Sequence, residues 1–106
     1  MEKPLGRDAL KLIADRFKLL SCATRLEILQ LLCRSERSVG EIVRETGYKQ
    51  ANVSRNLALL DRAGFVRRRT EGAFVHYSLA QESLPRLCEI MQDCLRASQA
   101  ELSRCL

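Results

Sequence analysis

Hydrophobic residues recur every three or four positions in the first third of the chain, a spacing that predicts helices. Apolar residues at this spacing between Asp8 and Leu20 predict a first amphipathic helix. A second helix is expected to run to about Cys33 or Arg34, and because it is apolar on most sides, it should lie centrally. Thr24 and Glu27 have the spacing of a capping box, which would start this second helix.

The next segment predicts a short helix and then a longer helix with polar sides. Ser38 and Glu41 repeat the capping-box spacing, and Gly47 ends the short helix. The longer helix is expected between Lys49 and the stop signal at Gly64. Its apolar side consists of Val53, Leu57 and Leu60, and its other sides carry Gln50, Asn52, Ser54, Arg55 and Asn56.

Two strand-like runs follow, and they predict a β-hairpin. Val66 to Thr70 and Ala73 to Leu79 are enriched in β-branched and aromatic residues, and Glu71-Gly72 would form a two-residue turn. This turn sets three facing pairs: Thr70 with Ala73, Arg69 with Phe74, and Arg67 with His76.

A last helix is expected to begin at Ser83-Leu84-Pro85 and to run to about residue 103. Its apolar residues form one continuous stripe: Leu84, Leu87, Cys88, Met91, Leu95 and Leu102. We expect this stripe to form a homodimer interface, while the alternative that it only covers the protein's own core stays open.

The order of these elements is typical of a winged helix-turn-helix. Between Leu20 and Leu79 the chain reads LSCATRLEIL, SVGEIV, YKQANVSRNLALLDRAGFV and RRTEGAFVHYSL. At the same spacing, these segments resemble LADPTRLRIL, SVGELA, LSQSTVSRHLKVLREAGLV and RREGRWVYYRL of the ArsR/SmtB-type bacterial repressors. The resemblance implies a mainly α (α+β) fold of about five helices with a two-stranded β wing, dimeric through the first and last helices.

A chain of 106 residues with 46% apolar content is expected to form a single domain, residues 1–106. Residues 20–79 would be its DNA-binding core, and residues 8–20 and 83–103 its terminal dimerisation helices. The sequence has no apolar run of about 18 residues and no apolar segment of the signal-peptide kind near its start, so we expect a cytoplasmic protein without a membrane partner.

The charge of the chain favours a polyanionic partner. Its formal net charge is +5, and eight basic against four acidic residues give +4 to the segment from Arg37 to Leu79. Amide and guanidinium side chains on a helix in the major groove can bind base edges or phosphates. The expected partner is operator DNA with an inverted repeat, contacted by Lys49, Gln50, Asn52, Ser54, Arg55, Asn56, Arg67, Arg68 and Arg69.

Two details qualify this DNA-binding set. Similar repressors usually have serine at the position of Lys49, so the resemblance implies that the helix loses a cap here while phosphate binding is kept. Side chains alternate along a strand, so Arg67 and Arg69 share one face of the wing and Arg68 takes the other. One or two of the three are expected to contact DNA.

Five cysteines without a C-x-x-C pair indicate reduced thiols and exclude a zinc ribbon. Some members of the resembled family sense arsenite through C-x-C in the third helix, which this chain lacks, and others bind zinc through Asp and His pairs. The one histidine here, His76, is expected to be an ordinary wing residue. Thiols remain as the candidate sensors, for arsenite, a soft metal ion, an oxidant or reactive sulfur: Cys22, Cys33, Cys88, Cys94 and Cys105.

These cysteines differ in their expected surroundings. Sulfide- and redox-responsive members of the resembled family use one cysteine of the second helix and one of the last helix. The resemblance therefore implies a pair made of Cys33 and either Cys88 or Cys94. A small buried hydrophobic role is the simpler interpretation of Cys33 and Cys88. Cys22, just before a helix N-terminus and near Arg25, is in a setting that lowers a thiol pKa.

The sequence also bears on two other function classes, an enzyme and a protein-binding module. An enzyme with a cysteine nucleophile would need a nearby histidine partner, and the sequence offers neither that nor a glycine-rich phosphate loop, so no enzymatic activity is expected. A winged helix used only for protein contacts, or a constitutive DNA binder without a thiol sensor, stays open. Steep salt dependence of binding would favour DNA over a protein partner.

Overall fold

The computed structural model describes the backbone of residues 3–105 and the side chains of residues 3–100. Within this part of the chain there are five helices and a three-stranded sheet, so the mainly helical fold is confirmed. The elements are α1 (Arg7–Leu20), α2 (Ala23–Arg34), β1 (Arg37–Ser38), α3 (Val39–Thr46), α4 (Gln50–Arg62), β2 (Val66–Glu71), β3 (Phe74–Leu79) and α5 (Ser83–Cys105).

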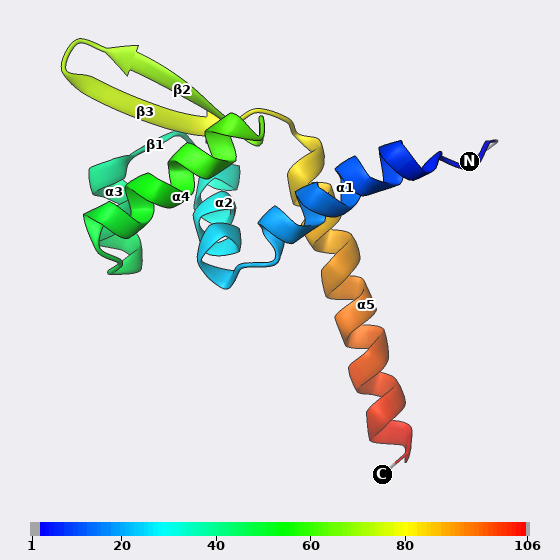
Figure 1. Ribbon diagram of the computed structural model, residues 1–106. Coiled ribbons are helices and arrows are strands. Elements are labelled where there is room, and N and C mark those ends of the chain that lie inside the picture. The colour runs from blue at the N-terminus through cyan, green and yellow to red at the C-terminus, as the bar shows by residue number, and fades with distance from the viewer. Residues whose placement is uncertain (1–2, 106) are drawn as a thin grey trace.

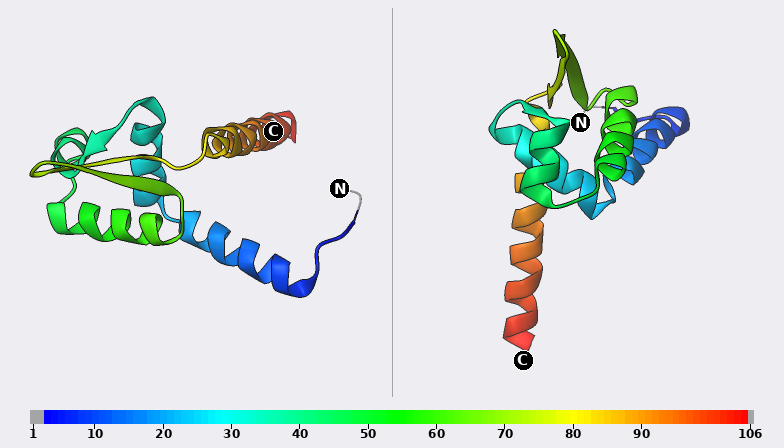
Figure 2. Two further views of the ribbon diagram at one scale, coloured as in Figure 1. Left: turned by 90° about the horizontal axis from the view of Figure 1, so that it is seen from above. Right: turned by 90° about the vertical axis from the view of Figure 1, so that its left-hand side faces the viewer.

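The elements between α1 and α5 form a small body, from which the two terminal helices project (Figure 1). The hairpin of β2 and β3 has its base near the connection to α5, and its tip points away from α5 (Figure 1). The N-terminal end of α4 lies at the same end of the molecule as the hairpin tip in both Figure 1 and Figure 2. A single ligand at this end of the molecule could therefore contact both the wing and the start of α4.

The core lies where α2, α3 and α4 meet. Five side chains in it are fully buried: Ile28, Ile42, Val53, Leu57 and Leu60. The expected apolar side of α4 and the central place of α2 are therefore confirmed, because these residues recur at helical spacing and bury one face of each helix. Phe65 and Val66 extend the core to the base of the wing.

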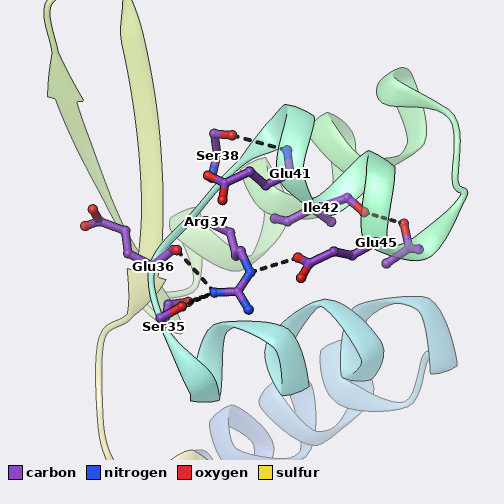
Figure 3. A network of polar contacts seen from close by, with 8 residues as sticks. Ser35, Glu36, Arg37, Ser38, Glu41, Ile42 and Glu45 are labelled. Carbon is purple, nitrogen blue, oxygen red and sulfur yellow. Dashed lines mark hydrogen bonds and ion pairs between the residues drawn. The ribbon is translucent and has the colours of Figure 1, made fainter.

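The capping box of α3 forms as expected. The Glu41 backbone N–H donates to Ser38 Oγ at 3.2 Å, and the Ser38 backbone N–H donates to Glu41 Oε1 at 3.0 Å (Figure 3). Gly47 ends the helix with a φ of 78°, a left-handed conformation that suits glycine. The capping box predicted from Thr24 and Glu27 is wrong, because α2 starts at Ala23 with Cys22 as its N-cap.

The wing differs from the expected hairpin in register and in strand number. Glu71 pairs with Phe74 and Arg69 with His76, so the turn is Gly72-Ala73 and the expected register was wrong by two residues. Gly72 has a φ of 60°, and two-residue hairpin turns need positive φ at their first central position, which glycine supplies more easily than glutamate.

A third strand was missed. β1 is only two residues long, and it pairs antiparallel with β3 through Arg37 opposite Tyr77 and Ser38 opposite His76. The sheet order is therefore β1-β3-β2. So short a strand carries no alternating pattern from which it could be recognised. It fixes the wing to the loop that leads into α3.

Candidate nucleic-acid interface

α4 presents polar side chains to solvent at the wing end of the molecule. Gln50, Ser54 and Arg55 are exposed, and Asn52 is half-buried. Lys49 is the exposed N-cap residue and makes no capping hydrogen bond through its side chain, as expected from its place in the sequence. These five expected contact residues are therefore accessible to a ligand.

Asn56 is a correction to the expected DNA-contact set. It is only 5% exposed, so it cannot reach a base edge. Its Oδ1 accepts a hydrogen bond from Arg25 Nη1 at 3.1 Å, and its Nδ2 donates to Asn52 Oδ1 at 2.8 Å. At about 100° per residue, position 56 lies about 40° from Leu60 and about 60° from Val53, at the edge of the buried side of the helix, and polarity alone suggested otherwise.

A hydrogen bond to α2 anchors the turn that leads into α4. Tyr48 Oη donates to Glu27 Oε2 at 2.5 Å, and this hydrogen bond raises the pKa of Tyr48. The Tyr48 backbone N–H donates to Thr46 Oγ1 at 3.2 Å. Glu27, expected in a capping box, therefore helps to set the position at which α4 begins.

The three wing arginines are all exposed but are not equivalent. Arg69 forms ion pairs with Glu36 at 2.6 Å and with Glu71 at 2.8 Å. The hydrogen bonds that Arg69 donates to Glu36, and then to Glu71, raise its pKa, while Arg69 holds the pKa of both carboxyls below their usual range. Among the described side chains, neither Arg67 nor Arg68 forms an ion pair.

Arg37, which precedes α3, stays within the protein. Its Nε donates to Glu45 Oε2 at 2.8 Å, and its Nη1 donates to Ser35 O at 3.1 Å and also contacts Ser35 Oγ (Figure 3). Its side chain is 12% exposed. Although Arg37 adds to the positive charge counted in the sequence, its guanidinium joins α3 to the preceding loop rather than facing solvent.

The cysteines are more exposed than their buried interpretation predicts. Cys33 and Cys88, together with Cys94, are exposed in the described chain, so the simple core role is wrong for this protomer. Desolvation of the Cys33 thiol raises its pKa, and charge on Cys88 raises it further. The end of α2 therefore lies close enough to α5 for the charge of Cys88 to act on Cys33. The side chain of Cys105 lies outside the described residues.

Cys22 behaves in the opposite way. It is half-buried at the N-terminus of α2. The backbone N–H of Arg25 lowers the pKa of the Cys22 thiol, against a smaller opposing effect of burial, and Thr24 and the Arg25 charge lower it further. A thiolate is therefore easier to form at this position, as its place before a helix start predicts.

The terminal helices carry large apolar side chains in solvent. Leu12, Phe17, Met91 and Leu95 are each more than half exposed. A groove of about 370 Å³ lies between α1 and α5, and its walls include Phe17, Leu84 and Ile90. Such a continuous apolar surface on a small domain is typical of a face that a partner covers.

The part of the chain that the structure describes contains neither a metal-ligand cluster nor a membrane-spanning helix. No cluster of three or more His, Cys, Asp or Glu side chains is arranged to hold a metal ion. None of the described helices combines the length and the apolar character that crossing a membrane requires.

Two residues important to this surface, Arg25 and Glu36, were not expected as site residues. Arg25 lies in the first turn of a mostly apolar, central helix, which was a usable signal because a cation in such a place needs acceptors. Glu36 gave no signal, since its contact with Arg69 spans 33 residues of sequence and depends on β1.

Comparisons with known proteins agree with this architecture. Residues 22–68 match the family described as "Bacterial regulatory protein, arsR family". Rv0081 of Mycobacterium tuberculosis, described as an uncharacterized HTH-type transcriptional regulator, is 37% identical over 86 residues, which are 80% of this chain and 75% of that protein. Its crystal structure gives a TM-score of 0.82 at 33% identity, covering 91% of this chain and 97% of that chain.

Two further similarities add detail. The homodimeric winged helix-turn-helix DNA-binding domain of Mb0332 from Mycobacterium bovis, a possible ArsR-family regulator, gives a TM-score of 0.74 at 35% identity over 91% of each chain. A probable mercury resistance operon repressor of Streptomyces lividans is 34% identical over 91 residues, 84% of this chain and 70% of that protein. The fold is a winged helix-turn-helix, and the chain belongs to the arsR family of bacterial regulatory proteins.

Proposed function

We propose that this protein is a transcriptional repressor that binds operator DNA through α4 and the wing, with release by a signal that acts on thiols. The observation that carries the DNA-binding part is the exposed polar surface of α4 beside a wing on which Arg67 and Arg68 have no ion-pair partner among the described side chains. Unpaired guanidinium groups beside a helix with amide side chains suit phosphates and base edges respectively.

The repressor acts as a homodimer through α1 and α5. The exposed apolar side chains of both helices support this assembly, since covering them removes apolar surface from water. Two copies related by a two-fold axis present two α4 helices, which fit half-sites about 34 Å apart, one turn of B-DNA. The operator is therefore an inverted repeat, and the protein acts in the cytoplasm.

The signal is a thiol-directed agent, and Cys33 with Cys88 is the preferred sensor pair. The charge of Cys88 raises the pKa of Cys33, which supports proximity between α2 and α5. With peroxide, the two thiols would give one disulfide and two water molecules. Arsenite or a soft metal ion would instead replace the thiol protons, and the mercury-related name of one relative is consistent with such an agent. Cys22 and Cys94 are the alternative thiols.

The test is binding of the full chain to its own upstream DNA, measured by fluorescence anisotropy under reducing conditions and over a salt series. Selective binding to an inverted repeat that weakens steeply with salt supports the repressor. If the reduced protein selects no duplex, the DNA-binding proposal fails, and a protein partner for the wing becomes the better interpretation.

The sensor part is tested separately by repeating the titration with arsenite, polysulfide or peroxide. Release from DNA that is lost in Cys33→Ser and Cys88→Ser, but kept in Cys94→Ser, supports the preferred pair. If none of the agents changes binding, the protein is a constitutive DNA binder and the thiol signal is dropped.

A further inference from the structure

A chain of hydrogen bonds runs from the end of α1 to the exposed surface of α4. Arg25 Nε donates to the Leu19 carbonyl at 2.6 Å, and Arg25 Nη1 donates to Asn56 Oδ1 at 3.1 Å. Asn56 Nδ2 then donates to Asn52 Oδ1 at 2.8 Å and to the Asn52 carbonyl at 2.9 Å. The middle residue, Asn56, is 5% exposed, and Arg25 and Asn52 are half-buried, so the centre of the chain of hydrogen bonds is shielded from water.

The guanidinium of Arg25 determines the direction of every bond in this chain. A guanidinium has donors only, so Asn56 must turn its amide oxygen toward Arg25. The Asn56 amide nitrogen then necessarily faces Asn52, and Asn52 must accept this hydrogen bond with its side-chain oxygen. An isolated asparagine amide can turn over and exchange its oxygen for its nitrogen, but here each amide has one orientation that satisfies its neighbours.

The Asn52 amide nitrogen is the free end of the chain. Within the described part of the structure, Nδ2 of Asn52 has no hydrogen-bond partner, and no buried side-chain nitrogen or oxygen lacks one. Since Asn52 is only half-buried, Nδ2 is therefore the polar atom that it offers to solvent. It lies on α4 between the exposed residues Gln50 and Ser54.

We propose that Arg25, acting through Asn56, is a positioning residue that fixes Asn52 as a hydrogen-bond donor toward DNA. The inference rests on the proposed role of α4 as the reading helix. A donor selects the acceptors of the major groove, which are purine N7, guanine O6 and thymine O4, and it rejects the N4 donor of cytosine. Specificity at one base pair of each half-site is thus set by a residue that does not touch DNA.

Asn56→Asp tests this directly, because with a side chain of the same shape it reverses the hydrogen bond between the side chains of positions 56 and 52. It also replaces the hydrogen bond to the Asn52 carbonyl with a contact between two acceptors, so folding of the variant is checked as well. An aspartate has acceptors only, so it retains Arg25 as a partner, now as an ion pair. Asn52 must then donate its Nδ2 inward and turn its oxygen outward. The preferred base at the contacted position should change from one with an acceptor to one with a donor, cytosine N4 or adenine N6, by about fivefold.

The experiment measures binding of the full chain to every single base-pair variant of the bound upstream site. Asn52→Ala identifies the contacted base pair as the one whose preference disappears. A changed preference in N56D at that same base pair supports the proposal. An unchanged preference in folded N56D overturns it. A wild-type protein that selects no duplex overturns the proposed function instead, so the two failures are distinguishable.

If N56D does not fold, Asn52→Asp tests whether Asn52 acts as a hydrogen-bond donor toward DNA. Its carboxylate still accepts the hydrogen bond from Asn56 but offers no donor to DNA, so the preference for acceptor-bearing bases should fall by about fivefold. If N52D keeps the wild-type preference, the proposal is overturned. Thermal unfolding and binding to an unrelated duplex confirm that each variant is folded and retains its contacts with phosphate.

Discussion

Glu36 binds the guanidinium of Arg69 at two points. Arg69 Nη2 lies 2.6 Å from Glu36 Oε1, and Arg69 Nε lies 3.2 Å from Glu36 Oε2. The remaining nitrogen, Nη1, is 2.8 Å from Glu71 Oε2. Every nitrogen of this guanidinium therefore already has an acidic partner within the protein. A DNA phosphate has to compete with two carboxylates for Arg69, whereas Arg67 and Arg68 face no such competition within the described structure.

The first prediction follows from this competition: Glu36→Gln should tighten DNA binding. Removing the carboxylate charge releases Arg69 for a phosphate, and the gain should be about twofold to fivefold, the range expected for an exposed ion pair. The slope of log affinity against log salt should steepen by up to about 0.9 for the additional phosphate contact. Anisotropy titrations over a salt series measure both quantities.

Glu82→Gln is the matched control for this change. Glu82 is exposed and has no ion-pair partner among the described side chains, so its neutralisation changes the net charge equally without releasing an arginine. An equal gain in E36Q and E82Q would show that net charge alone matters and that Glu36 does not restrain Arg69.

The second prediction ranks the three arginines of the wing. Arg67→Gln and Arg68→Gln should each weaken binding to all sequences alike and reduce the salt slope by about 1. Arg69→Gln should cost less, since its charge is already neutralised by Glu36. In the E36Q background, however, Arg69→Gln should cost more than it does in the wild type, although Glu71 still keeps its cost below that of the other two. A larger loss from Arg69→Gln than from either neighbour in the wild-type background would contradict this ranking.

The fold was predictable to the extent that its elements have local signals. Helical spacing of apolar residues gave all five helices, and the Ser38 capping box gave the start of α3. β1 was not recoverable, because it depends on pairing between residues far apart in sequence, whereas the hairpin register was wrong because Gly72 was assigned to the second instead of the first central position of the turn. Arg37 opposite Tyr77 is an example, since 40 positions separate the two residues and β1 itself is two residues long.

The candidate site was predictable as a surface but not as a set of contacts. The polar residues of α4 could be identified from sequence, yet Asn56 was misplaced because a polar residue among apolar ones can satisfy its hydrogen bonds inside the protein. Its partner Arg25 lies 31 residues away, and the partner of Arg69 lies 33 residues away. Which polar residues are occupied internally is settled only by the folded structure.

The third prediction concerns the joint between the wing and α3. Ser38→Ala should lower the free energy of unfolding by about 1 kcal/mol, because it removes the side-chain acceptor of the α3 capping box. Chemical denaturation measures the change. Ser54→Ala, on the exposed side of α4, is the control and should leave stability within about 0.5 kcal/mol of the wild type. Equal effects of the two substitutions would mean that the capping box contributes nothing.

The fourth prediction concerns the apolar faces of α1 and α5. Met91→Glu should weaken dimerisation at least tenfold, corresponding to about 1.4 kcal/mol, because it puts a charge where an apolar side chain would be covered. Met91 is 58% exposed in the single chain, so this substitution should not unfold the protomer. Sedimentation equilibrium measures the change. Gln92→Glu, about 100° round the helix, adds the same charge and should have a smaller effect.

The fifth prediction uses the opposite pKa shifts of two thiols. The backbone N–H of Arg25 lowers the pKa of Cys22, so its thiolate should form at a lower pH than that of an ordinary cysteine. Desolvation raises the pKa of Cys33, so its thiolate should form at a higher pH. Since the thiolate is the nucleophile, alkylation of Cys22 should reach its half-maximal rate at the lower pH.

Iodoacetamide labelling at a series of pH values, with each cysteine followed by peptide mass spectrometry, measures these two profiles in the reduced protein. The Cys33 midpoint should fall in Cys88→Ser, because the charge of Cys88 contributes to the raised pKa of Cys33. The Cys22 midpoint should not move in that variant and serves as the internal control. A Cys33 midpoint that is unchanged in C88S would show that the two thiols do not interact, and it would remove the main support for Cys33 with Cys88 as the sensor pair.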